Sequence, residues 1–220
     1  MIRLFLLSIL SALLLSGQAA DKANERYRTP EGRQGMLGTL GAPDRAERIH
    51  AQAVVQALAL KPGMVAADLG TGAGALLPAL SAAVGPSGKI FAEDIFQDFL
   101  DSSKLKNAAL TNVVWVLGAD RDPKLPAASI DAAATVDAYH HWDYPAEMLA
   151  NLRRALKPGG RFVVADYYRR PGAMGPSPDA LEHIRIDRDE VIKEVEAAGF
   201  KLLATSDTNP GKQYIAVFTR

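Results

Sequence analysis

Three glycines and one carboxylate stand close together in the first half of the chain. The glycines occupy positions 70, 72 and 74, and Asp68 precedes the first of them by two residues. Three missing β-carbons within five residues allow the backbone to turn sharply and to approach a ligand closely. A carboxylate here is poorly placed beside an anionic pyrophosphate but suits a cation such as an amino group or a sulfonium. The residue types therefore predict a site for a positively charged, phosphate-free ligand.

A strand and a helix are expected to hold this turn. Residues 65–69 are small and apolar, which is typical of a short buried strand. The apolar residues 73–84 predict a helix whose first free N–H groups face the ligand. The spacing from Gly70 to Ala75 also satisfies the relaxed dinucleotide pattern G-x-G-x-x-A. An NAD-dependent oxidoreductase is thus one alternative, disfavoured by Asp68, and a purely structural tight turn is another.

Acidic residues lie at the ends of five predicted strands. The strands are expected at residues 65–69, 89–93, 112–117, 130–136 and 161–166. The acids are Asp68, Asp94, Asp120, Asp137 and Asp166. Ligands of open α/β sheets bind beyond the carboxyl ends of the strands, so we expect these carboxylates around one site. Glu93 adjoins Asp94, but side chains alternate along a strand, and we expect only one of the two to face the site.

Two separate segments resemble the class I S-adenosylmethionine (SAM)-dependent methyltransferases. The first is Asp-x-Gly-x-Gly-x-Gly at 68–74, and the second is Leu-Lys-Pro-Gly-Gly-Arg-Phe-Val-Val-Ala-Asp at 156–166. The resemblance extends over roughly residues 46–220. It implies an α/β fold with a doubly wound, mostly parallel, seven-stranded Rossmann-like sheet. The last of its strands, predicted at 213–219, would be antiparallel.

The resemblance implies SAM as the cofactor. Asp68 would hold the amino group of the methionine moiety, and Asp94, preferred to Glu93, would bond to the ribose hydroxyls. Asp120 would accept the adenine amino group, although in the family an acid more often follows the glycine directly. The full set of expected cofactor-binding residues is Asp68, Gly70, Thr71, Gly72, Gly74, Asp94, Ile95, Asp120 and Asp137.

Candidate acid–base groups follow the fourth predicted strand. Tyr139, His140 and His141 come directly after Asp137, next to where methyl transfer is expected. A histidine with an ordinary pKa of about 6.5 can take up a proton at neutral pH. Alternatively, the histidines cap the next helix or pack on Trp142. Adjacent residues rarely converge on one ion, so we expect no metal site from the two histidines; a metal held with Asp137 and Asp166 is the alternative.

The first twenty residues have the layout of a secretory signal peptide. Arg3 precedes an apolar run at 4–15, and small residues then allow cleavage after Ala19 or Ala20. The run is short for a bilayer span, which needs about 20 residues. We therefore expect a periplasmic or secreted protein without stable membrane insertion after cleavage, or a membrane-anchored one if the segment is retained.

The remaining chain divides into two predicted parts. Residues 21–45 are polar and rich in glycine, which favours a flexible arm or lid, with a disordered spacer as the alternative. Residues 46–220 form the predicted methyltransferase domain. Asp44 and Glu47 predict a capping box for a helix at 45–59.

Composition narrows the function further. The 25 basic and 25 acidic residues balance, so no net charge favours nucleic acid as a partner. The absence of cysteine excludes disulfides, thiolate nucleophiles and cysteine metal sites. We therefore predict an enzyme of EC 2.1.1 type that methylates a small molecule. The alternative is an exported, non-catalytic protein that binds SAM or another nucleoside.

Overall fold

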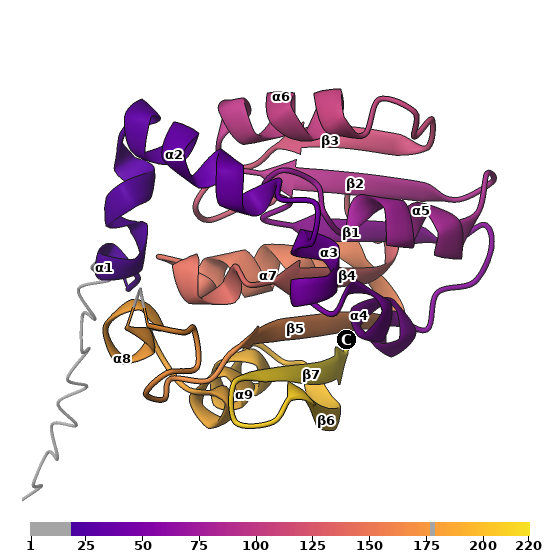
Figure 1. Cartoon of the computed structure of the whole chain (residues 1–220). Coiled ribbons are helices and arrows are strands. Elements are labelled where there is room, and N and C mark those ends of the chain that lie inside the picture. Colours follow the sequence, from indigo (N-terminus) through magenta and orange to yellow (C-terminus); the bar gives the residue numbers. More distant parts are fainter. Residues whose placement is uncertain (1–18, 177–178) are drawn as a thin grey trace, which may run out of the picture.

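A single seven-stranded sheet forms the centre of the computed structural model, which describes residues 19–176 and 179–220 (Figure 1). The strand order is β3-β2-β1-β4-β5-β7-β6. The strands are β1 (Val65–Leu69), β2 (Lys89–Asp94), β3 (Val113–Leu117), β4 (Ile130–Val136), β5 (Leu156–Tyr167), β6 (Lys201–Asn209) and β7 (Gln213–Thr219). Strands β1 to β5 pair in parallel, whereas β7 is antiparallel to both β5 and β6. The predicted fold class is confirmed.

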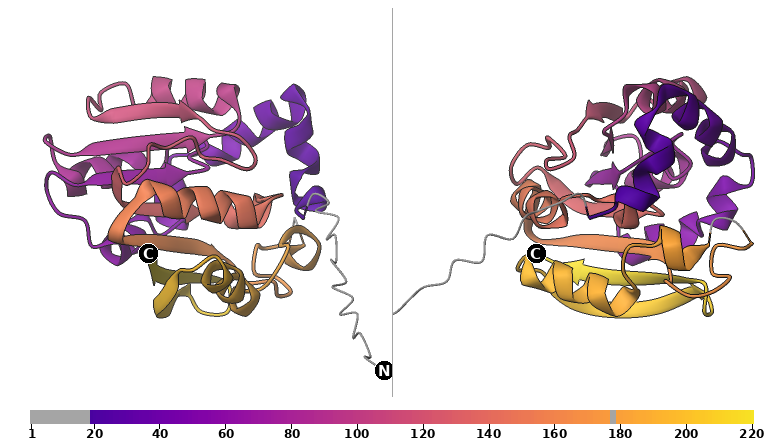
Figure 2. Two further views of the ribbon diagram at one scale, coloured as in Figure 1. Left: turned by 180° about the vertical axis from the view of Figure 1, so that it is seen from behind. Right: turned by 90° about the vertical axis from the view of Figure 1, so that its left-hand side faces the viewer.

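Helices cover both faces of the sheet. They are α1 (Asp21–Asn24), η1 (Glu25–Arg28), α2 (Pro30–Leu40), α3 (Arg45–Arg48), α4 (Ala51–Leu58), α5 (Leu77–Val84), α6 (Gln97–Lys106), η2 (Tyr139–His141), α7 (Pro145–Ala155), α8 (Ala180–His183) and α9 (Arg188–Ala197). Side chains of α4 and α5 belong to one apolar core, and those of α7 and α9 belong to a second. Figure 1 shows α4 and α5 in front of the sheet, and the view from behind in Figure 2 shows α7 and α9. The sheet is therefore doubly wound.

Strand register brings the expected acids to one edge of the sheet. Asp68 lies opposite Ala92 of β2 and Ala134 of β4. Asp94 ends β2, and Asp137 follows directly after β4. Because parallel strands end on the same side, these carboxylates gather at the carboxyl edge, where ligands of such sheets bind.

Two predicted helix starts differ from the structure. The helix expected at 45–59 is divided into α3 and α4 at His50, whose φ is 51°. Asp44 forms no capping hydrogen bond, so the predicted capping box is wrong; its carboxylate instead pairs with Arg48 at 3.2 Å. The helix expected from residue 73 begins at Leu77, because Gly74 extends the preceding turn by donating to the carbonyl of Thr71.

The predicted arm at 21–45 contains three short helical segments. None of the residues of α2 is buried, which agrees with an element outside the core. The arm is nevertheless attached: the amide of Ala19 donates to the backbone carbonyl of Asp143, and the amide of Ala20 and the side chain of Asn24 donate to its carboxylate. Opening of the arm as a lid, and its boundary with the domain at residue 45, stay predictions.

Nearly all of the expected signal peptide lies outside the described residues. Among the residues from 19 onward that the structure describes, no helix has both the length and the apolar character to cross a membrane.

Candidate active site

A cleft opens at the carboxyl edge of the sheet, between the arm and the glycine turn. It encloses about 990 Å³ of empty volume, including the open solvent at its mouth. The lining residues include Asn24, Tyr27, Arg45, Asp68, Gly70, Thr71, Gly72, Glu93, Asp94, Ile95, Phe96, Phe99, Asp120, Asp137, His141 and Asp143.

The glycine turn forms one wall of the cleft. Gly70 has a φ of 72°, and a β-carbon there would lie 2.9 Å from Cβ of Ala138, so a side chain at this position would be strained. Gly72 also has a positive φ, and its N–H donates to Asp94 at 2.9 Å. Gly74 does not line the cleft; an added β-carbon would collide with Asn107 and Ser103 of the α6 region. The structure thus gives the third glycine a packing role where we expected contact with the cofactor.

Three buried carboxylates surround the turn. Burial raises the pKa of Asp68 to about 7, although the hydroxyl of Thr71, which donates to it at 2.7 Å, acts in the opposite direction. Burial also raises the pKa of Asp94 to about 6 and the pKa of Glu93 well above its ordinary value. A cation bound beside such carboxyls lowers their pKa and favours their charged form.

Glu93 and Asp94 both line the cleft, so the expectation that only one of them would do so is wrong. Gly118 explains the difference, because any side chain there would collide with Oε1 of Glu93. The glutamate therefore occupies space that another residue at 118 would fill. Within the described parts of the chain, this Oε1 atom is buried and has no hydrogen-bond partner.

An apolar surface continues from Asp94 along the cleft. Ile95 is 41% exposed and lines the cleft together with Phe96 and Phe99. Tyr27 of the arm packs on both phenylalanines, with ring centroids 6.2 and 5.9 Å apart. Asp120 is exposed and also lines the cleft. A flat aromatic group with a polar edge fits this surface.

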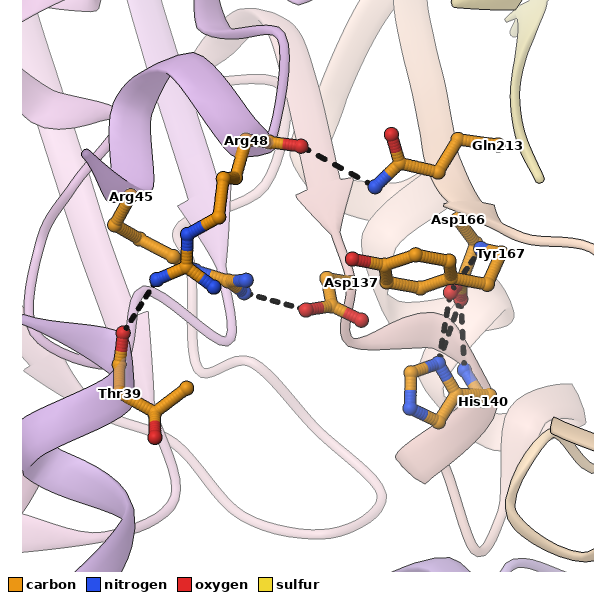
Figure 3. A network of polar contacts seen from close by, with 8 residues as sticks. All are labelled: Thr39, Arg45, Arg48, Asp137, His140, Asp166, Tyr167 and Gln213. Carbon is orange, nitrogen blue, oxygen red and sulfur yellow. Dashed lines mark hydrogen bonds and ion pairs between the residues drawn. The ribbon is translucent and has the colours of Figure 1, made fainter. Parts of the chain in front are cut away.

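Asp137 is paired with a residue that sequence reasoning did not assign to the site. Its backbone has a φ of 52°, and Arg45 donates to its Oδ2 at 2.5 Å (Figure 3). Arg45 is only 7% exposed. The pair neutralises Asp137. Among the described residues, Asp68, Glu93 and Asp94 are then the buried carboxyls of the cleft without a basic partner.

The three acid–base candidates point in three directions. Tyr139 is fully buried, lies outside the cleft lining, and donates its hydroxyl to Glu194 at 3.0 Å, so the structure does not support an acid–base role for it. His140 also lies outside the lining, and its Nδ1 contacts Asp166 at 2.8 Å (Figure 3). Only His141 of the three lines the cleft, where its Nδ1 contacts Oδ1 of Asn24 at 2.9 Å.

Four of the five expected strand-end acids line the cleft, and Asp166 does not. Its carboxylate accepts from the backbone N–H groups of His140 and Tyr167 as well as contacting the His140 ring. Sequence reasoning missed Asn24, Tyr27, Arg45 and Asp143. No spacing in the chain connects these residues with the glycine turn.

Comparison with known proteins agrees with this geometry. Residues 67–164 match the family model described as "Methyltransferase domain". The ubiquinone/menaquinone biosynthesis C-methyltransferase UbiE of Bordetella avium is 26% identical over 165 residues, which are 74% of this chain and 64% of that protein. An uncharacterised 37.1 kDa transposon protein of Streptomyces fradiae is 36% identical over 130 residues, 59% of this chain and 37% of that one. The chain therefore spans less than two thirds of either relative.

A solved structure extends the similarity over most of the chain. It is described as a SAM-dependent methyltransferase from Aquifex aeolicus, and it superposes with a TM-score of 0.76 at 26% identity. The match covers 84% of this chain and 97% of that one.

Proposed function

We propose that this chain transfers the methyl group of SAM to a small organic molecule. Its residues 67–164 match the methyltransferase domain family, whose methyl donor is SAM. The observation that carries the proposal is the group of buried carboxyls at the glycine turn. Asp68, Glu93 and Asp94 are each no more than 5% exposed. Ligands with a positive charge and no phosphate suit such a group, and SAM carries an ammonium and a sulfonium.

We assign the cofactor-binding roles to residues that line the cleft. Asp68, next to the turn, would pair with the ammonium of the methionine moiety. Asp94 would accept the ribose hydroxyls, beside Ile95 and Phe96, which offer an apolar surface to adenine. Asp120 also lines the cleft and would accept the adenine amino group.

The activated sulfonium needs little chemical help from the protein. Alignment of the acceptor with the methyl group and exclusion of water supply most of the acceleration. The arm contributes Asn24 and Tyr27 to the cleft opposite the turn, and Tyr27 contacts the ring of His141 with centroids 4.8 Å apart. A cleft narrowed in this way favours a small acceptor. The Bordetella relative is named as a C-methyltransferase of quinone biosynthesis, which makes aromatic rings one class of acceptor to test.

Export to the periplasm or beyond is part of the proposal, since residues 1–20 have the layout of a signal peptide. The same layout supports the second candidate, an exported SAM-binding protein without catalysis, because SAM is made in the cytoplasm. Mass measurement of the purified protein from each cell fraction would test export: a chain that retains Met1 in the cytoplasm would contradict it.

Calorimetry with SAM, its demethylated product and NADH tests the ligand class. We expect binding of the first two and none of NADH; tight binding of NADH alone would reverse the assignment. Incubation with methyl-labelled SAM and a metabolite extract then separates the two candidates. Transfer of label to a small molecule supports the enzyme, whereas binding without transfer to any fraction supports the binding protein.

A further inference from the structure

Three of the four histidines of the chain form one cluster. His140 and His141 belong to η2, and His183 ends α8, more than forty residues later. The ring centroids of His140 and His141 lie 4.1 Å apart, and both lie just over 5 Å from the ring of His183. One nitrogen of each ring lies within 4.8 Å of the corresponding nitrogens of the other two.

Neighbouring acceptors orient two of the rings. Nδ1 of His140 contacts both carboxylate oxygens of Asp166, at 2.8 and 3.0 Å, and Nδ1 of His141 contacts the amide oxygen of Asn24 at 2.9 Å. Because oxygen accepts in each contact, Nδ1 carries a proton, and in the neutral ring Nε2 keeps a free lone pair. A carboxylate that accepts from a histidine Nδ1–H is the usual support of a histidine metal ligand.

Nε2 of His140 is a second observation that points to a bound ligand. His140 is 2% exposed, and its Nε2 is buried without a hydrogen-bond partner in the part of the chain that the structure describes. A buried polar atom that is left unpaired costs about 1–3 kcal/mol. A ligand at this atom would remove that cost.

We propose that His140, His141 and His183 bind one divalent transition-metal ion through one nitrogen each. Three imidazoles favour Zn²⁺, Cu²⁺, Fe²⁺ or Ni²⁺ over Mg²⁺ and Ca²⁺, which prefer oxygen ligands. Zn–N bonds of about 2.0–2.1 Å in a tetrahedron require nitrogens roughly 3.4 Å apart, so the rings must approach one another by up to about 1.5 Å. Three protein ligands leave the fourth position of zinc for water or another molecule.

A second group, Asp137, His140 and Asp166, also has ligand atoms within 4.8 Å of one another. It is less suited to a metal because its acids already have partners. Asp137 accepts from Arg45, and both oxygens of Asp166 accept N–H groups. The histidine cluster contains no such competing charge.

The metal site would lie beside the proposed methyl-transfer site. His141 lines the cleft, whereas His140 and His183 do not. The proposal therefore gives His141 a ligand role in place of the acid–base role predicted from the sequence. It also replaces the expectation of no metal at these histidines, because His183 supplies a third ring that the sequence did not place here. It concerns metal binding alone and holds whether or not the chain transfers methyl groups.

The test uses the full chain, purified without a polyhistidine tag and stripped of metal with a chelator. Titration with ZnCl₂ by calorimetry should give one ion per chain, and Co²⁺ should give the visible absorption of a low-coordinate site. His141→Ala and His183→Ala should each weaken Zn²⁺ binding at least 100-fold. His50→Asn, which keeps a residue that tolerates the positive φ at that position, should change nothing.

Asp166→Asn tests the support of His140. Its loss should weaken Zn²⁺ binding 10- to 100-fold, the usual effect of removing such a partner. Thermal unfolding without metal identifies variants that fail to fold, and His183→Ala, on a short helix outside the sheet, decides the result if Asp166→Asn is unfolded. Zn²⁺ binding that is absent in the wild type, unchanged in His183→Ala, or lost equally in His50→Asn would overturn the proposal.

Discussion

Replacement of Asp68 by asparagine should weaken SAM binding and stabilise the free protein at the same time. Asparagine keeps the shape and can still accept from Thr71, so mainly the charge is lost. A hydrogen bond to a charged group contributes about 1.5–3 kcal/mol, which corresponds to a roughly 10- to 150-fold increase in Kd. Full Coulomb attraction at 4 Å and an effective dielectric constant of 20 would be about 4 kcal/mol, an upper limit.

The stability effect has the opposite sign because the carboxylate is buried without a basic partner. Its pKa rises from 3.8 to about 7 on folding. The stability that such a group contributes is fully present below its unfolded pKa and is lost as the pH rises through its folded pKa. Between these limits the free energy of unfolding falls by about 4 kcal/mol by pH 8. An asparagine amide without a partner would cost about 1–3 kcal/mol. We therefore expect the free energy of unfolding of Asp68→Asn to exceed that of the wild type by about 1–3 kcal/mol at pH 8.

Calorimetry with SAM and denaturant unfolding at pH 5 and pH 8 measure the two effects. Asp131→Asn is the matched control, since Asp131 lies near the start of β4, away from the carboxyl edge that forms the cleft. There it accepts from Val65 and Lys157. This control should leave the Kd for SAM unchanged. An unchanged Kd in Asp68→Asn, or an equal loss in the control, would refute a cation at Asp68.

Three further predictions concern neighbouring groups of the cleft. Asp94→Ala should weaken SAM binding by about 1–3 kcal/mol, because the ribose hydroxyls lose their acceptor; an unchanged Kd in calorimetry would transfer this role to Glu93. SAM affinity should rise from pH 5 to pH 8, since the carboxyls of Asp68 and Asp94, with pKa values of about 7 and about 6, lose their protons over this range; a flat Kd across a pH series would contradict it. Arg45→Met should lower the free energy of unfolding by about 3–5 kcal/mol, because it leaves Asp137 unpaired; denaturant unfolding should show recovery when Asp137→Asn is added, and no recovery would exclude the ion pair as the cause.

The sheet could be predicted because its signals are local. Each strand of the parallel part is a short apolar run with an acid or a turn at its end, and the carboxyl edge then follows from parallel pairing. Helix starts were less predictable. Residues 73–76 are as apolar as those of α5, yet the turn made by Gly74 delays the helix to Leu77.

The site was predictable at the strand ends and in the glycine turn, but not after β4. After β4 the chain enters η2, a 3-10 turn in which successive residues point about 120° apart. Tyr139 therefore enters the core, His140 meets Asp166, and His141 faces the cleft. Adjacent letters in the sequence do not reveal this divergence. The position of His183 beside these histidines could not be predicted either, because it lies on a short helix more than forty residues later in the chain.

Cleavage of the peptide bond between Ala19 and Ala20 would change the hydrogen bonds that attach the arm. The amide of Ala20 donates to Asp143 at 3.0 Å, and Asn24 joins that carboxylate to His141. Proteolysis at this peptide would convert a neutral amide into a primary ammonium facing the same oxygen. Charge-assisted hydrogen bonds are roughly twice as strong as neutral ones, so the bond from Ala20 would strengthen, while the bond from the amide of Ala19 to the carbonyl of Asp143 would be lost.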